Sequence, residues 1–342
     1  MHHSLSGEKI PALILSTLLF ALPAQAQSGN EMLAGVSWSG FVDASYVYDA
    51  GTGMNTFGVD QFEIDLTKDF GGIGSFRADI EWVNDGMGGF TLALEQGYVT
   101  FSPESFNGTT LTFGQFNAPI GFELLDPNDM YQFSHALVFD YGLPTNLTGA
   151  MVTAPLGETF DIALYLVNGW DQNVDPNKGK TVGGRLGFSF GEKGGAGLSA
   201  AHGDPGVFGS QSLTVIDIDL TLTPTETVTL GAEFNTGRDV NILDVTNTWM
   251  GLMAMGHVDF ASGHGVTGRV DFFNDPDALR LGTGVAEARK AVTIAPTFSL
   301  GENMGALAEI RFEFSDQDVF VDSNGAAVGS STILAFEMTY SF

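Results

Sequence analysis

The sequence predicts an all-β protein, a transmembrane up-and-down antiparallel β-barrel of about sixteen strands with one long loop folded inward. Three observations predict this fold: residues 332–342 alternate between large apolar and small or polar side chains, similar segments of about ten residues recur from residue 38 onward, and short and long connections take turns. In the closing segment the alternation ends on Tyr340 and Phe342, aromatic residues that suit a membrane interface and that we interpret as an assembly signal.

The alternating segments are clearest where aliphatic or aromatic residues oppose acids. Phe62, Ile64 and Leu66 share one face of such a segment, and Glu63 and Asp65 share the other. The predicted strands span 38–49, 57–70, 73–84, 90–102, 109–116, 146–155, 159–170, 180–190, 194–202, 212–223, 226–237, 246–260, 264–274, 290–300, 304–315 and 331–342. Because residues 93–101 and 194–202 alternate poorly, a barrel of fourteen or eighteen strands remains an alternative.

The connections alternate in length. Those after even-numbered strands are short, such as Gly71-Gly72 and Pro224-Thr225, whereas those after most odd-numbered strands are long and acidic. Outer-membrane barrels have tight periplasmic turns and longer external loops, so the parity favours a barrel over a soluble sandwich. The connection 117–145 has no clear alternation but carries much apolar surface, so we expect it to fold into the lumen rather than remain an external loop.

The N-terminal region predicts export. A short apolar run from Ala12 to Leu22 precedes Ala24-Gln25-Ala26, so residues 1–26 are predicted to be a signal peptide, 27–37 a periplasmic segment and 38–342 the barrel. The run is too short for a membrane helix, which needs roughly 20 residues. The chain has no cysteine, which excludes disulfides and thiolate metal sites.

The formal net charge is −28, which disfavours a nucleic-acid partner and attracts cations. Strand parity places many acids but few bases on the lumen face; Arg77, Arg185, Arg269 and Arg311 are the predicted inward arginines. The predicted pore lining is Asp43, Glu63, Asp65, Asp79, Glu81, Asp217, Asp219, Glu233, Glu309, Arg311, Glu313 and Glu337. The predicted constriction consists of Glu123, Asp126 and Asp129 from the long loop, facing Arg77 and wall acids.

Other chemistry is weakly indicated. No enzyme is predicted, because the serine and histidine pattern of an outer-membrane phospholipase is absent and His257 with Asp259 would lie at the periplasmic end, away from an extracellular rim. No cofactor or metal is predicted either. Acidic outer loops such as Asp316, Asp318 and Asp322 offer oxygen ligands for Ca²⁺, but their spacing does not follow an EF-hand loop.

Residues 92–171 carry motifs of a known family. The run Gly114-Gln115-Phe116-Asn117-Ala118-Pro119-Ile120-Gly121-Phe122-Glu123 resembles the G-K-F-x-x-P-I-G-Y-E element of the OmpL-like outer-membrane β-barrel porins. Glu95 to Val99 is similar to the family's E-Q-A-Y-V, and Val167 to Asp171 to its V-N-G-W-D. Gln115 replaces the usual lysine, which makes the constriction more acidic, and Phe122 replaces the usual tyrosine. The resemblance implies a channel class rather than a particular solute.

We therefore expect an outer-membrane porin, a passive diffusion channel for small hydrophilic solutes with a preference for cations. The alternative is a barrel with a closed pore that serves as an adhesin or other surface interaction protein. The expected partners of the protein are outer-membrane lipid, the barrel assembly machinery and small solutes or cations. A homo-oligomer is left open.

Overall fold

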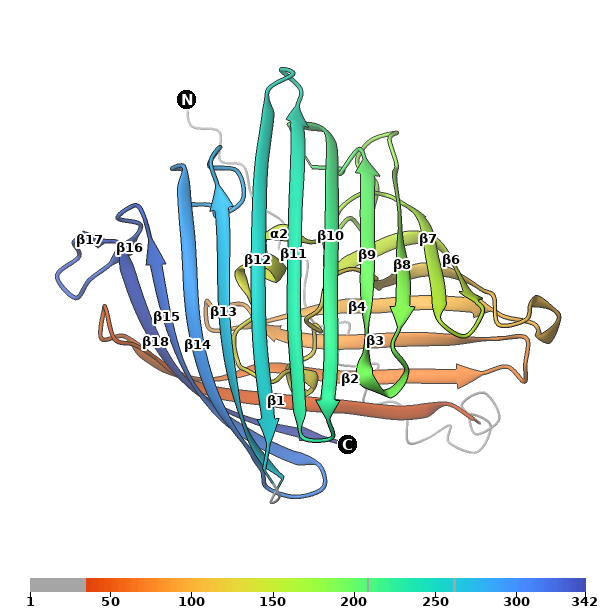
Figure 1. Ribbon diagram of the computed structural model, residues 1–342, viewed down its shortest axis with the longest axis horizontal. Coiled ribbons are helices and arrows are strands. Elements are labelled where there is room, and N and C mark those ends of the chain that lie inside the picture. The colour runs from red at the N-terminus through yellow and green to blue at the C-terminus, as the bar shows by residue number, and fades with distance from the viewer. Residues whose placement is uncertain (1–34, 208, 261–262) are drawn as a thin grey trace, which may run out of the picture. The chain divides into compact units, whose positions relative to one another are not determined.

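A computed structural model describes residues 35–207, 209–260 and 263–342. The predicted signal peptide and most of the predicted periplasmic segment lie outside these residues. Sixteen antiparallel strands form a closed barrel in which each strand pairs with its neighbours in sequence, and β1 closes the ring between β2 and β18 (Figure 1). Among the described residues, no helix is both long and apolar enough to cross a bilayer.

The strand bounds agree closely with the prediction. The wall consists of β1 (Ser37–Asp49), β2 (Asn55–Asp69), β3 (Gly74–Asn84), β4 (Phe90–Phe101), β5 (Thr110–Asn117), β6 (Asn146–Leu156), β7 (Phe160–Val167), β8 (Thr181–Ser189), β9 (Gly194–Gly203), β10 (Ser210–Thr225), β11 (Val228–Asn241), β12 (Thr246–Asp259), β13 (His264–Asp275), β14 (Glu287–Ser299), β15 (Met304–Ser315) and β18 (Ser330–Ser341). The remaining elements are η2 (Glu104–Phe106), η3 (Pro127–Asp129), α2 (Leu137–Gly142), η4 (Gly191–Lys193), β16 (Phe320–Val321) and β17 (Ala327–Val328).

Two of the differences from the prediction have local reasons. The strand predicted over 159–170 ends at Val167, because the chain turns through Asp171, whose φ is 54°. The connection predicted over 316–330 contains a small hairpin, in which β16 pairs with β17. Neither difference changes the sixteen strands of the wall.

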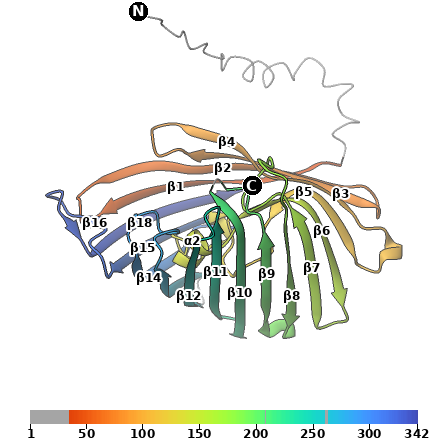
Figure 2. The same ribbon diagram turned by 90° about the horizontal axis from the view of Figure 1, so that it is seen from above.

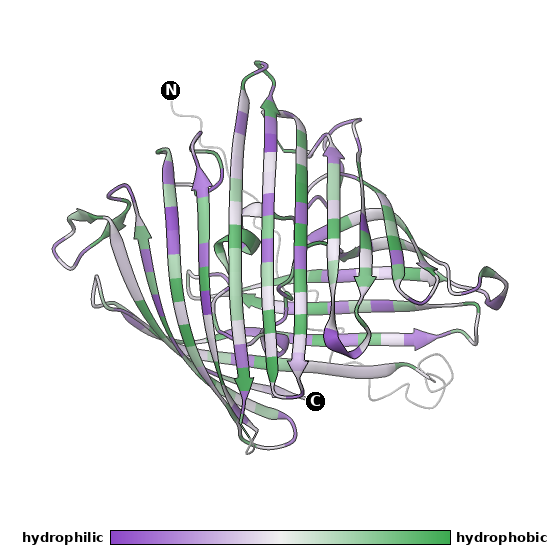
Figure 3. Cartoon of the chain, viewed as in Figure 1, coloured by the Kyte–Doolittle hydropathy of each residue, from purple (hydrophilic) through white to green (hydrophobic). Residues whose placement is uncertain are grey.

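Side chains alternate across the wall as the sequence predicts. Leu334, Phe336 and Met338 on β18 are about 40% exposed, whereas Glu337 between them is 3% exposed. The same banding of hydrophobic and hydrophilic residues runs along the other strands (Figure 3). We call the face with the buried polar side chains the inner face. The opposite, apolar face is outward, as expected for strands that meet lipid.

The barrel closes where β1 pairs with β18, from Phe41 opposite Ser341 to Asp49 opposite Ile333. The backbone N–H of Phe342 donates to the Gly40 carbonyl at 2.9 Å, and the Gly40 N–H donates to the Phe342 carbonyl at 3.2 Å. The Phe342 ring stacks on that of Phe62 with a centroid distance of 6.3 Å. Phe342 therefore covers the seam between β18, β1 and β2, while its role in assembly stays a prediction.

Candidate functional site

The inner face carries the acids that strand parity predicted to point inward. Of the predicted pore lining, the buried members are Asp43, Glu63, Asp79, Asp217, Asp219, Glu233, Glu309, Arg311 and Glu337, and the half-buried members are Asp65, Glu81 and Glu313. The prediction missed further buried charges on this face: Glu95, Asp239, Asp275, Glu287 and Arg289. A charge is expensive on a lipid-facing surface, which explains why these side chains occupy the inner face.

The 117–145 segment joins β5 to β6 and contains η3 and α2. The family-like motifs hold its two ends. The Gln96 side-chain oxygen accepts from the Asn117 N–H at 3.0 Å, and Asp171 accepts from the N–H groups of Thr145 and Asn146 at 2.8 and 2.9 Å. Gly121 turns the chain with a φ of 91°, where a Cβ would lie 2.6 Å from Leu143. These contacts fix where the segment leaves and rejoins the wall.

Arg269 of β13 and Arg311 of β15 donate hydrogen bonds to the middle of the segment. We call this pair the arginine clamp. Arg269 Nη1 donates to Glu123 at 2.7 Å and to the Ser134 carbonyl at 2.5 Å, and its Nη2 donates to the His135 carbonyl at 2.9 Å. Arg311 donates to the same His135 carbonyl at 2.8 Å. The guanidinium fork can satisfy several acceptors at once, which suits this role.

The charges of the clamp are balanced inside the barrel. The Arg269 side chain is fully buried and pairs with Glu123 at 2.7 Å and with Asp271 at 3.3 Å. Asp271 also pairs with Arg311 at 3.5 Å and accepts from the Leu137 N–H at 3.0 Å. Glu123 thus pairs with Arg269 and not with Arg77, the arginine that the sequence suggested.

The rest of the segment packs on β11 to β13. Phe122 donates its N–H to Glu233 at 2.7 Å, and Asn235 donates to the Val138 carbonyl at 3.1 Å. An apolar cluster joins the segment to the inner face of β5–β7 and β9–β14: Phe116, Ile120, Leu137, Leu143, Leu147, Tyr165, Val167, Trp170, Ala201, Leu213, Val215, Trp249, Phe273, Leu281 and Ala291. The 117–145 segment therefore packs against these strands through α2, which lies beside β11 and β12 (Figure 2). That it narrows a pore stays a prediction.

The opposite side, β2 to β4, is acidic. Glu63 lies opposite Glu81, and Asp65 lies opposite Asp79. Like charges directly opposite one another destabilise a sheet unless something compensates them. Arg77 compensates the second pair, since its Nε donates to Asp79 at 2.8 Å and its Nη2 lies 3.5 Å from Asp65.

Glu95 reaches this acidic wall through a β-bulge. The register of β3 against β4 shifts between Asp79, which pairs with Gln96, and Ile80, which pairs with Leu94. Glu95 is the extra residue, so Glu95 and Gln96 both turn to the inner face and are 3% and 7% exposed. Bulges often re-aim a side chain in this way. The bulge also explains why residues 93–101 alternate poorly in the sequence.

The predicted constriction residues lie in three different environments. Glu123 is in the clamp, Asp129 is exposed in η3 next to β18, and Asp126 faces the acidic wall. Burial, reinforced by the carboxylates of Glu95, Asp129 and Asp65, raises the pKa of Asp126 to about 7. A cavity of about 280 Å³ lies between the segment and the wall, lined in part by Phe122, Asp129 and Thr229.

His257 and Asp259 do come together, with 3.1 Å between His257 Nε2 and Asp259 Oδ1. The other ring nitrogen of His257 lies 2.8 Å from Thr267 Oγ1, and the ring packs at a tilt against Tyr131 with a centroid distance of 4.5 Å. These contacts give the pair a packing role beneath the 117–145 segment.

Comparison with known proteins places this geometry in a family. Solved structures with the same fold include an anion-selective porin from Comamonas acidovorans, with 13% identity, a TM-score of 0.67, and 90% of this chain and 99% of that chain covered. A trimer form of OmpT from Vibrio cholerae has 11% identity and a TM-score of 0.67, with the same shares covered. Salmonella typhi OmpF in complex with daunomycin has 13% identity and a TM-score of 0.64, with 90% and 97% covered.

No curated protein sequence matches the chain. The family model described as "Putative beta-barrel porin-2, OmpL-like" matches residues 35–342, which include the whole barrel and each of the motifs at 92–171. The closed barrel of sixteen strands agrees with the β-barrel that this description names. The chain therefore belongs to the OmpL-like β-barrel porin family of the outer membrane.

Proposed function

We propose that this porin is a passive diffusion channel for small hydrophilic solutes that favours cations. The observation that carries the cation preference is the acidic wall of β2 to β4, where Glu63, Asp65, Asp79, Glu81 and Glu95 face a single arginine, Arg77. Fixed charges of one sign in a narrow passage raise the local concentration of the opposite ion. The arginines of the opposite side contribute little net field, because Arg269 and Arg311 are paired with Glu123, Asp271 and Glu313.

The passage itself would run between the 117–145 segment and the acidic wall. The segment and the apolar cluster occupy much of the face of β5–β7 and β9–β14, η3 lies next to β18, and Asp126 faces the wall acids. The polar surface left over belongs mainly to β1–β4, β15 and β18. One structural neighbour is anion-selective although it has the same fold, so ion preference follows from the wall charges rather than from the barrel.

Reversal potentials test the ion preference. With the purified protein in planar bilayers under a potassium chloride gradient, we expect the zero-current potential to have the sign for potassium selectivity. Neutralising the wall in a Glu63→Gln/Glu81→Gln variant should move that potential toward zero, because the fixed negative charge is lower. A zero-current potential of the chloride-selective sign would refute the proposal.

Deleting residues 122–140 tests the role of the segment. We expect a higher single-channel conductance, since the deletion removes α2, η3 and the residues gripped by the arginine clamp. Heat-dependent mobility on gels would verify that the shortened barrel is folded. Unchanged conductance would mean that the segment does not lie in the conducting path.

The apolar cluster also favours a second candidate function, a barrel whose pore is closed and whose exposed loops bind another surface. Absence of any steady conductance in single-channel recordings of folded protein would support this alternative. Assembly into a homo-oligomer is a further prediction; a trimer form is known for the similar OmpT.

A further inference from the structure

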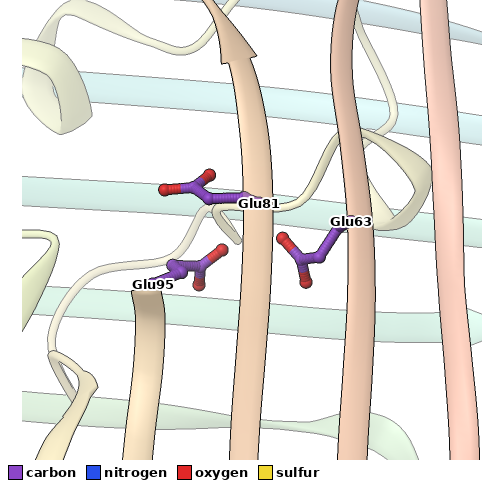
Figure 4. Close-up of side chains that lie close together, drawn as sticks. All are labelled: Glu63, Glu81 and Glu95. Carbon is purple, nitrogen blue, oxygen red and sulfur yellow. The ribbon is translucent and has the colours of Figure 1, made fainter. Parts of the chain in front are cut away.

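Three carboxylates on neighbouring strands converge on one point of the acidic wall. Glu63 of β2, Glu81 of β3 and Glu95 of β4 lie close together, with Glu63 and Glu95 directed toward each other (Figure 4), and one oxygen of each lies within 4.8 Å of the others. Two oxygens bound on opposite sides of a Ca²⁺ ion are about 4.6–5.2 Å apart, since each Ca–O distance is about 2.3–2.6 Å. The spacing therefore fits a shared calcium ion without large movement.

Glu95 supplies a second and independent observation. Glu95 is only 3% exposed, and neither of its carboxylate oxygens has a hydrogen-bond partner among the described residues. A buried carboxylate normally has partners, because an unsatisfied charge in a low-dielectric environment is costly. The β-bulge aims this unpartnered group into the cluster. A bound cation would supply the missing partner.

The neighbouring residues do not fill that role. Arg77 is committed to Asp79 and Asp65. Gln61 places its Nε2 3.1 Å from one oxygen of Glu63 and 3.1 Å from one oxygen of Glu81, which leaves their other oxygens available. Neither Arg77 nor Gln61 donates a hydrogen bond to the Glu95 carboxylate. Like charges therefore remain opposite one another at Glu63 and Glu81, and Glu95 adds a third from β4.

We propose that Glu63, Glu81 and Glu95 bind a calcium ion on the inner wall of the barrel. Three carboxylates match the charge and the hard oxygen ligands that Ca²⁺ prefers, and water can complete its six to eight ligands. Mg²⁺ needs near-ideal octahedral geometry and keeps most of its water, so it fits a set of wall-anchored carboxylates less well. Zn²⁺ prefers nitrogen and sulfur ligands, which this cluster lacks.

Calorimetric titration of the detergent-solubilised full-length barrel with calcium chloride, after removal of bound metal by a chelator, tests the proposal. We expect about one saturable site per chain with a lower affinity for Mg²⁺. Glu95→Gln, which keeps the shape but removes the charge, should weaken calcium affinity by at least about tenfold. Glu81→Gln, at a less buried position, should also weaken it and guards against a folding defect of the first variant.

A matched control replaces the external acids by Asp316→Asn, Asp318→Asn and Asp322→Asn, which should leave calcium affinity unchanged. Calcium should also raise the unfolding temperature of the native protein but not that of Glu95→Gln, because only the native barrel gains from binding. The proposal is overturned if no saturable binding occurs, if both glutamine variants bind like the native protein, or if only the external-loop variant loses binding. None of these measurements requires the barrel to conduct.

Discussion

Replacing Arg269 by methionine is expected to free the 117–145 segment and to give a larger, noisier single-channel conductance. The substitution keeps a long apolar side chain but leaves Glu123 and Asp271 as buried charges without their closest partner. Breaking a buried ion pair in this way commonly costs about 3–5 kcal/mol. It also removes the donors to the carbonyl oxygens of Ser134 and His135.

We expect Arg269→Met to destabilise the 117–145 segment rather than the strands of the wall. The strands of the barrel are held by continuous backbone pairing from β1 to β18, which does not involve the Arg269 side chain. The folded barrel should therefore persist, as shown by heat-dependent gel mobility, while planar-bilayer recordings report the altered conductance. Arg311→Met should have a similar but smaller effect, because Arg269 would still hold Glu123 and the Ser134 carbonyl.

Arg238→Met is the matched control. Arg238 lies on β11 near the long-loop end and is exposed, and among the described residues its side chain donates a hydrogen bond to Thr246 alone, at 3.1 Å. Its replacement should leave the conductance unchanged. If Arg269→Met gave the native conductance in a folded barrel, the arginine clamp would not be what holds the segment.

The contacts of the arginine clamp could not be predicted from the sequence. Alternation predicted that Arg269 and Arg311 point inward, and motif resemblance singled out Glu123, but nothing local relates residues 146 positions apart. Their contact depends on how the 117–145 segment crosses to β13, which has no periodic pattern to read. The sequence consequently suggested Arg77 as the partner of the loop acids.

The wall was predictable for the opposite reason. A strand buried on one side repeats every two residues, and a shift by one residue would place its charges on the apolar face, so register and pattern constrain each other. The pattern failed where the structure itself breaks the period. At the bulge in β4, Glu95 and Gln96 both face inward, so Glu95 was missed although it completes the acidic wall.

Gly40→Ala is expected to prevent or strongly weaken closure of the barrel. Gly40 is buried where β1 passes between β2 and the chain end after β18, and a Cβ there would lie 2.2 Å from the Glu63 carbonyl oxygen and 2.8 Å from the Phe342 ring. The ring could rotate away, but the carbonyl belongs to the backbone of β2 and can move only if the strands separate. The expected loss of stability exceeds the about 1–3 kcal/mol that overpacking usually costs.

Gly268→Ala separates this steric effect from the general effect of removing a glycine. Gly268 lies in the middle of β13 on the exposed face, with no atom within 4 Å of the position of its Cβ. There, alanine should be neutral or stabilising by up to about 0.5–1 kcal/mol, because glycine loses more conformational freedom when a strand forms. Urea unfolding in lipid vesicles, read by heat-dependent gel mobility, should thus give changes of opposite sign for the two variants. Equal effects would show that the contact of Gly40 with β2 and Phe342 does not limit closure of the barrel.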